Sequence, residues 1–453
     1  MSSEKRLYVF ASLADGWAPA GQLDLTEQAS TLLASRFAYG LRYLQRPDAI
    51  EVDPVSLSLS DRESVRARRL FPANGLTLFG GIRDAAPDAW GRRVIEAKLK
   101  AGANSLPEST YLLHAGGQRI GALDIRESLD GQNHRHSDET AANVGVDNLQ
   151  YLVDSADRIE EGLPVPSGLE AIFVQGSGLG GARPKATIRD DNRVLWLAKF
   201  PSKSDRMSVT QIEEATLRLA AECGIRVPPT RIVSLGKRRV MLIRRFDRYW
   251  THPDAATRVG DDALYLPPSP GASEQRVPFA SALTLVGCTE SESIGKRYQD
   301  VADTIRRYVH RDFIRADIRE LFKRMIFNVL VSNDDDHLRN HGFIWDARLP
   351  GWRLSPLYDV LPRPSSAFER YLHLGVGPQG RLATLDNALA AKDAFGLYGA
   401  DAAQAIAEVW SKVREWKVSF DAHAVPEKEI DIVAPAFRHI DDVSSAALRN
   451  ALP

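Results

Sequence analysis

The most informative stretch of the chain is Ser332-Asn333-Asp334-Asp335-Asp336-His337-Leu338-Arg339-Asn340. It directly follows residues 313–330, whose broad apolar stripe predicts a buried helix. Three adjacent carboxylates repel one another, which costs free energy unless cations or hydrogen-bond donors lie among them. Asp and Asn are also ordinary turn residues, and acidic turns are usually solvated. This segment alone therefore leaves both a functional site and a solvated turn open.

The spacing within the segment favours a functional site. Asp335 precedes Asn340 by five positions, the interval between the catalytic Asp and the metal-binding Asn in the kinase loop H-R-D-x-x-x-x-N. Asp359 follows downstream, beside a β-like segment. Together the three side chains form a set of oxygen ligands that suits Mg²⁺, which binds carboxylates, phosphate oxygens and water.

A candidate phosphate-binding loop lies upstream, where glycines 176, 178 and 181 match G-x-G-x-x-G. A lone match of this kind is weak, and it also marks flexible turns and Rossmann loops. A Rossmann or Walker loop leads straight into a helix. Here Pro184 precedes two β-like runs, 186–188 and 194–199, which flank a turn at 190–192. The sequence therefore predicts a hairpin and a glycine-rich loop that folds over phosphates as in a kinase.

Lys199 ends the second run of this hairpin, between Ala198 and Phe200. Burying a lysine in a strand costs free energy unless its charge is paired. A lysine at the solvent-exposed end of a strand would avoid this cost. Glu213 and Glu214 lie on the following amphipathic helix, and either could form the Lys–Glu pair that positions ATP phosphates.

The rest of the chain predicts an α+β protein. Alternation at Phe37, Tyr39, Leu41 and Tyr43 indicates a strand, and residues 84–99 indicate a helix. The polar stretch 129–143 is expected to be a loop in which His134 and His136 are solvated. The Pro- and Gly-rich residues 252–277 are expected to form a long surface loop. We expect three domains: an N-terminal α/β subdomain (1–128), a β-rich nucleotide-binding lobe (145–248) and an all-helical catalytic lobe (249–453).

Composition narrows the function classes. The chain has 453 residues, of which 44% are hydrophobic. Its 58 Lys and Arg residues nearly balance its 59 Asp and Glu residues, so it lacks the overall positive charge that drives nonspecific binding to nucleic acids or membranes. Two cysteines, Cys223 and Cys288, cannot form a disulfide framework. With no long apolar run and no signal-peptide pattern at the start, we expect a cytoplasmic protein without membrane attachment.

The order of these motifs resembles the HipA family of serine/threonine kinases, the toxins of bacterial toxin–antitoxin modules. The resemblance covers almost the whole chain, and the ordered set is more specific than any single motif. The matching segments are FAYGLRYL and FGGIRDAAPDAWGR (79–92) in the N-terminal third, GGARPK (180–185), LAKFP (197–201), RFDR (245–248), NDDDHLRNHGF (333–343) and LSPLYDVLP (354–362).

The resemblance implies a protein-kinase-like two-lobed fold with an extra N-terminal subdomain, and it assigns roles by position. Asp335 would be the catalytic Asp, Asn340 and Asp359 the Mg²⁺ ligands, Lys199 the phosphate lysine and Glu214 its partner. Phe246 would lie at the adenine hinge, Asp247 near the ribose, and His337 would support the catalytic loop. The remaining residues expected to bind ATP are Gly178, Gly180, Gly181, Ala182 and Lys185 of the glycine-rich loop.

One departure from the family concerns self-inactivation. The serine that many members autophosphorylate falls at Gly178, so Ser177 is the remaining candidate for this modification. Phosphorylation would add negative charge and could eject the loop from the nucleotide site.

The resemblance also implies partners. A HipB-like helix-turn-helix antitoxin would bind the chain and carry most of the DNA contact. The substrate would be a serine or threonine of a host protein, with glutamyl-tRNA synthetase as the family precedent, and growth arrest the outcome. Two other classes remain open: a catalytically silent antitoxin-binding co-repressor, and a small-molecule kinase of related fold.

Overall fold

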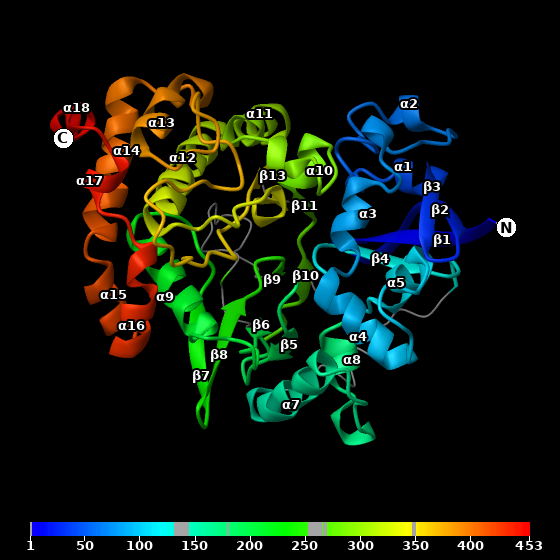
Figure 1. Cartoon of the computed structure of the whole chain (residues 1–453). Helices are drawn as coiled ribbons and strands as arrows, with labels where there is room; N and C mark the ends of the chain where they lie inside the picture. The colour runs from blue at the N-terminus through cyan, green and yellow to red at the C-terminus, as the bar shows by residue number, and fades with distance from the viewer. Residues whose placement is uncertain (1, 131–144, 179–180, 252–264, 266–269, 347–349) are drawn as a thin grey trace. The chain divides into compact units, whose positions relative to one another are not determined.

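The chain forms two compact units in a computed structural model (Figure 1), which describes residues 2–130, 145–178, 181–251, 265, 270–346 and 350–453. Unit 1 comprises residues 1–203 and 235–280, and unit 2 comprises residues 204–234 and 281–453. Most of the predicted polar loop, including His134 and His136, lies outside the described residues, as does much of 252–277. The division into three domains stays a prediction.

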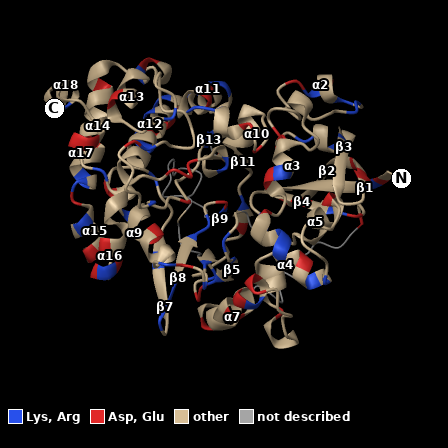
Figure 2. Cartoon of the chain, viewed as in Figure 1, with Lys and Arg blue, Asp and Glu red and all other residues tan. Residues whose placement is uncertain are grey.

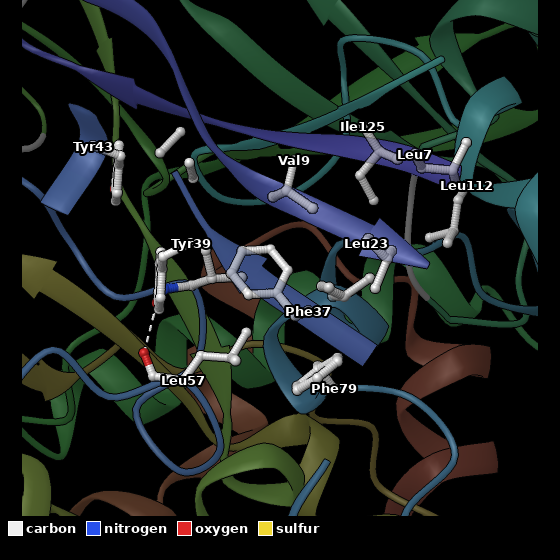
Figure 3. Packing of buried hydrophobic residues seen from close by; sticks show 14 of the residues in the cluster. Leu7, Val9, Leu23, Phe37, Tyr39, Tyr43, Leu57, Phe79, Leu112 and Ile125 are labelled. Carbon is white, nitrogen blue, oxygen red and sulfur yellow. Dashed lines mark hydrogen bonds between the residues drawn. The ribbon is translucent and has the colours of Figure 1, made fainter. Parts of the chain in front are cut away.

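Unit 1 begins with an antiparallel sheet of order β3-β2-β1-β4, formed by β1 (Ser3–Leu13), β2 (Gly16–Gln28), β3 (Thr31–Tyr39) and β4 (Leu123–Arg126). Its buried side chains pack against short helices (Figure 3). Phe37 is 1% exposed and meets the rings of Tyr39 and Phe79 edge-on, at centroid distances of 4.9 and 6.0 Å. The Tyr39 hydroxyl donates to the Leu57 carbonyl at 2.6 Å, which satisfies the polar end of a buried ring. The helices of this region are α1 (Leu41–Leu44), α2 (Arg62–Val65), α3 (Gly80–Ala85), α4 (Ala89–Leu99) and α5 (Glu108–His114).

The strand predicted across Phe37, Tyr39, Leu41 and Tyr43 is wrong beyond Tyr39, because α1 begins at Leu41. Leu41 is exposed, whereas Tyr43 is buried and its ring stacks on that of Tyr39 at 6.0 Å. Two aromatic residues four positions apart fit a helical turn as well as a strand, so a period of two over so few residues did not distinguish them.

The second half of unit 1 contains the predicted hairpin. The strands β5 (Lys185–Arg189) and β6 (Leu195–Lys199) pair antiparallel, and β6 also pairs with β8 (Arg238–Arg244). A small pair is formed by β9 (Arg248–Trp250) and β10 (Glu274–Arg276). Two helices, α7 (Leu149–Glu160) and α8 (Ile172–Gln175), precede the hairpin.

Unit 2 is mainly helical, and its central helix α12 (Ile314–Val331) is buried along most of its length, as predicted. It is not all-helical, because β12 (Gly342–Asp346) and β13 (Gly351–Leu354) pair antiparallel directly after the acidic segment. The strands β7 (Thr230–Leu235) and β11 (Phe279–Ser281) lie where the chain passes between the units. The other helices are α9 (Val209–Glu222), α10 (Ala282–Val286), α11 (Tyr298–Tyr308), α13 (Leu385–Ala390), α14 (Gly399–Val413), α15 (Trp416–Ala422), α16 (Glu427–Val433), α17 (Ile440–Val443) and α18 (Ala446–Ala451).

Acidic and basic residues are interspersed along both units (Figure 2), in keeping with the net charge of −1. Among the described residues, no helix combines the length and the apolar character needed to cross a membrane.

Replacing Phe37 with alanine should lower the free energy of unfolding of unit 1 by about 3–5 kcal/mol, since it leaves a cavity between Tyr39 and Phe79. Urea unfolding followed by intrinsic fluorescence measures this. Leu33→Ala on the same strand is the control, because Leu33 is 44% exposed and should cost well under about 1 kcal/mol. Equal losses in the two variants would contradict the packing described.

Candidate active site

The predicted site residues divide between the two units. Unit 1 contains Ser177, Gly178, Gly181, Ala182, Lys185, Lys199, Phe246 and Asp247; unit 2 contains Glu214, Asp335, His337, Asn340 and Asp359; Gly180 lies outside the described residues. Each half is therefore described within its own unit.

The hairpin of unit 1 brings two lysines together. Lys185 at the start of β5 lies directly opposite Lys199 at the end of β6, and both are buried, at 4% and 6% exposure. Residues directly opposite in an antiparallel pair share one face of the sheet, and like charges placed there are unfavourable. Two ammonium groups beside a glycine-rich loop form a concentration of positive charge that suits phosphate groups.

The described part of the glycine-rich loop folds close to this hairpin. Gly181 has φ +83°, a left-handed conformation that favours glycine, and a Cβ there would come within 2.5 Å of Lys185 Nζ. Ala182 next to it is exposed. The loop therefore passes against the Lys185 side chain.

Ser177 and Gly178 are both buried at the start of the loop. Ser177 is 1% exposed and its hydroxyl donates to the Ala115 carbonyl at 3.2 Å. A Cβ at Gly178 would lie 2.5 Å from Ala115 O and 2.7 Å from Arg119 N. In this conformation the backbone of residues 115–119 excludes a serine at 178 and encloses the hydroxyl of Ser177.

Phe246 and Asp247, the predicted hinge residues, are buried in unit 1. Asp247 Oδ1 accepts from Arg245 Nε at 2.8 Å, and Oδ2 accepts from Arg245 Nη2, Arg248 Nη1 and the Gly121 amide at 2.6, 2.7 and 2.8 Å. Burial alone would raise the pKa of Asp247, but attraction to Arg245 and Arg248 outweighs it and holds that pKa well below the usual range. Asp247 is only 2% exposed, and its role as a ribose ligand stays a prediction.

Glu214 is buried in α9, where its Oε1 accepts from Arg218 Nε and Thr230 Oγ1, both at 2.9 Å. Its neighbour Glu213 is buried as well. The structure thus shows Glu214 engaged within unit 2, and its pairing with Lys199 stays a prediction.

The acidic segment of unit 2 begins where α12 ends, at Ser332 in a left-handed conformation with φ 51°. Arg363 resolves part of the repulsion that the sequence implied: its Nε lies 3.0 Å from Asp334 Oδ1 and its Nη2 lies 3.0 Å from Asp335 Oδ2. All three side chains are about half exposed. The Asp335 carboxylate is therefore at the surface of unit 2, beside one guanidinium.

Asp336, by contrast, is buried at 1% exposure, and its Oδ1 accepts from the His373 amide at 2.7 Å. Burial raises its pKa to about 7, against the opposing effect of the Tyr298 hydroxyl. The buried ring of His341 has its pKa lowered to about 3 by burial and by Arg324 and His337. Asp336 is therefore protonated in part near neutral pH, which relieves a further part of the repulsion.

Asn340 closes the segment. It ends a 3₁₀ turn (Leu338–Asn340), and its Nδ2 donates to the Asp335 carbonyl at 2.7 Å. His337 is half-buried, with its ring 5.8 Å from that of His373, which fits the predicted supporting role. The structure thus brings Asp335, His337 and Asn340 together in one turn.

Asp359 follows β13 and is held near this turn by its neighbours. Tyr358 Oη donates to the Arg339 carbonyl at 2.8 Å, and the Leu361 amide to Asn333 Oδ1 at 3.4 Å. Asp359 itself has φ 54°, a conformation found mainly in glycine, Asn and Asp and often at functional sites.

The donor chemistry of this turn fits Mg²⁺. The hydrogen bond of Asn340 uses its amide nitrogen, which leaves the oxygen as the ligating atom. Among the described residues no group of three or more His, Cys, Asp or Glu side chains is arranged to hold a metal. Mg²⁺ needs fewer protein ligands when it is bound with a nucleotide, since phosphate oxygens and water complete its shell.

Sequence reasoning missed Arg363, the buried state of Asp336 and the role of residues 115–119. Arg363 lies 28 positions beyond Asp335, directly after the matching segment 354–362, and only the fold-back of the chain shows that it pairs with Asp335.

Comparison with known proteins agrees with this picture. The HipA-like C-terminal domain matches residues 177–417, more than half of the chain. The chain belongs to this family. The predicted kinase-like α+β fold is also confirmed: the chain resembles HipA of Shewanella oneidensis MR-1, solved with HipB and operator DNA, with TM-score 0.60, 15% identity, and coverage of 98% of this chain and 97% of that one.

Curated relatives of this HipA-like chain are named as kinases. One from Haemophilus influenzae, named "Putative kinase", is 27% identical over 241 residues, which are 49% of this chain and 64% of the relative. "Putative kinase Y4mE" of Sinorhizobium fredii is 28% identical over 166 residues, 36% of this chain and 34% of the relative. The matches thus span between a third and two thirds of the relatives' own length.

The buried carboxyl of Asp336 predicts a pH-dependent stability. Because its folded pKa of about 7 exceeds the unfolded value of about 3.9, the folded state binds more protons between these values, and stability falls as pH rises through that window. Relative to the wild type, Asp336→Asn should therefore gain stability between pH 5 and pH 8, by about 3 kcal/mol. Urea titrations across this range test it.

The exposed Asp421→Asn variant is the control for Asp336→Asn and should shift little with pH. A pH-independent difference between Asp336→Asn and the wild type would show that Asp336 does not titrate in this window.

Gly178→Ser should lower the free energy of unfolding of unit 1 by about 1–3 kcal/mol, because the new Cβ meets the backbone of Ala115 and Arg119. Gly168→Ser is the matched control, since nothing lies within 4 Å of a Cβ at that position. Denaturant titration of the two variants compares them, and equal stability would refute the close approach at Gly178.

Proposed function

We propose that this chain is an ATP- and Mg²⁺-dependent serine/threonine protein kinase. The observation that carries the proposal is the turn at residues 335–340. It presents the Asp335 carboxylate at the surface of unit 2 while Asn340 holds the Asp335 backbone carbonyl. Buried neighbours, Asp336 and Leu338, fix the backbone on which these two side chains stand. An exposed carboxylate on a rigid turn is suited to a hydroxyl substrate.

In this proposal the residues of unit 2 act on the acceptor. Asp335 orients the substrate hydroxyl and takes up its proton, and Arg363 must swing aside or share the carboxylate when the hydroxyl arrives. Asn340 and Asp359 hold Mg²⁺, which when bound neutralises charge on the phosphates. His337 supports the turn from its half-buried position.

The residues of unit 1 act on the nucleotide. Lys185 and Lys199 face each other across the hairpin and neutralise phosphate charge, and the glycine-rich loop supplies backbone amides. Glu214 orients Lys199, and Phe246 and Asp247 lie at the base and ribose. These roles come from the family resemblance.

The biological role that we propose is that of a toxin in a HipBA-like module. The Shewanella HipA was solved with HipB and operator DNA, which supports a helix-turn-helix antitoxin as partner. This chain carries a net charge of only −1, so the antitoxin would supply the basic surface for DNA. The substrate would be a cytoplasmic translation protein, with an aminoacyl-tRNA synthetase as the first candidate.

Asp335→Asn should reduce phosphate transfer from γ-labelled ATP into a lysate by roughly 10²–10⁴-fold, the usual contribution of a positioned general base. Labelled proteins are identified by mass spectrometry. Asp334→Asn is the matched control, because Asp334 pairs with the same Arg363 and should retain activity within a few-fold.

Equal labelling by the wild type and Asp335→Asn would contradict the proposal. ATP binding without any labelled protein would favour a small-molecule acceptor or a silent antitoxin-binding protein.

A further inference from the structure

The start of α4 binds Gly181, at the end of the glycine-rich loop, through both the amide and the carbonyl group of that residue. The Gly181 amide donates to Asp88 Oδ2 at 3.0 Å, and the Trp90 amide donates to the Gly181 carbonyl at 3.0 Å. Asp88 occupies the N-cap position of α4, but its side chain makes no cap hydrogen bond to that helix. Its carboxylate instead binds a residue 93 positions away.

A third contact comes from the Trp90 side chain. Its indole Nε1 donates to the Lys185 carbonyl at 2.8 Å, and the ring is completely buried. Trp90 therefore binds the first residue of β5, the strand that carries one of the two opposed lysines. A buried indole N–H normally finds a partner, and here that partner is the end of the loop.

The beginning of the loop is held by a different segment of the same region. Ser177 donates to Ala115, Gly178 packs directly against Ala115 and Arg119, and a Cβ at Gly176 would touch Val94 of α4 at 3.3 Å. Both described ends of the loop are thus anchored by residues that lie before position 120.

We propose that Asp88 and Trp90 are positioning residues that hold Gly181 and the start of β5 in place for phosphate binding. A glycine-rich segment loses more conformational entropy on ordering than other sequences do. If the loop were not anchored, the cost of ordering it would reduce the free energy of ligand binding. Anchors at both ends remove that cost before the ligand arrives. The identity of the ligand in this inference rests on the proposed function. The anchoring contacts themselves do not, because they are observed within unit 1.

The first test needs no ligand. Hydrogen exchange of the full chain, read by mass spectrometry on peptides that span 176–187, should accelerate roughly three- to tenfold in Asp88→Ala, which loses the acceptor for Gly181. Asp88→Asn keeps an acceptor oxygen and should restore most of the protection. Trp90→Phe keeps an aromatic side chain but loses the indole N–H, and it should accelerate exchange as well. Unchanged exchange in Asp88→Ala and Trp90→Phe would overturn the proposal.

The second test measures ATP with Mg²⁺ by titration calorimetry and steady-state kinetics. Asp88→Ala should raise the Kd and the KM for ATP roughly three- to tenfold with little change in kcat, and Asp88→Asn should recover the wild-type values. Tighter ATP binding in Asp88→Ala would overturn the proposal, because the carboxylate would then compete with phosphate for the Gly181 amide.

The two tests separate failure of this inference from failure of the proposed function. A wild-type chain that binds no ATP would refute the nucleotide role, while the exchange experiment would still decide whether Asp88 and Trp90 hold the loop.

Discussion

The repulsion among Asp334, Asp335 and Asp336 is the constraint around which unit 2 is arranged. It is relieved in part where the chain after β13 returns to the acidic turn. That return supplies Arg363 to two carboxylates and the His373 amide to the third. The same path fixes Tyr358 and Leu361 against the turn, and Asp359 lies between them. This fold-back thus brings the segment that carries Asp359 against the acidic turn.

Local patterns allowed much of the fold to be predicted. The β5–β6 hairpin, helix α12 and the acidic turn all have short-range signals: alternation, a 3.6-residue stripe and a fixed interval between Asp335 and Asn340. The strand predicted through Tyr43 failed because a few alternating aromatics fit a turn of helix equally well. The lobe predicted to be all-helical contains β12 and β13, although a β-like segment was predicted beside Asp359.

The site was harder to predict where contacts join distant segments. Nothing near Asp247 in the sequence shows that both its oxygens are taken by arginines and by Gly121, and nothing near Gly178 shows that Ala115 lies against it. The sequence also gives no basis for distinguishing two adjacent aspartates, yet Asp335 is exposed and Asp336 is buried. Only tertiary packing separates the residue that can meet a substrate from the one that supports the turn.

The opposed pair of Lys185 and Lys199 has a thermodynamic consequence for unit 1. Like charges directly opposite each other on one face of a hairpin repel, and an anion bound beside them would weaken that repulsion. A polyanion that binds there stabilises the folded state by mass action, by about 2.7 kcal/mol at a hundredfold excess over its Kd. If the proposed nucleotide is that polyanion, the stability of the folded protein depends on the nucleotide concentration.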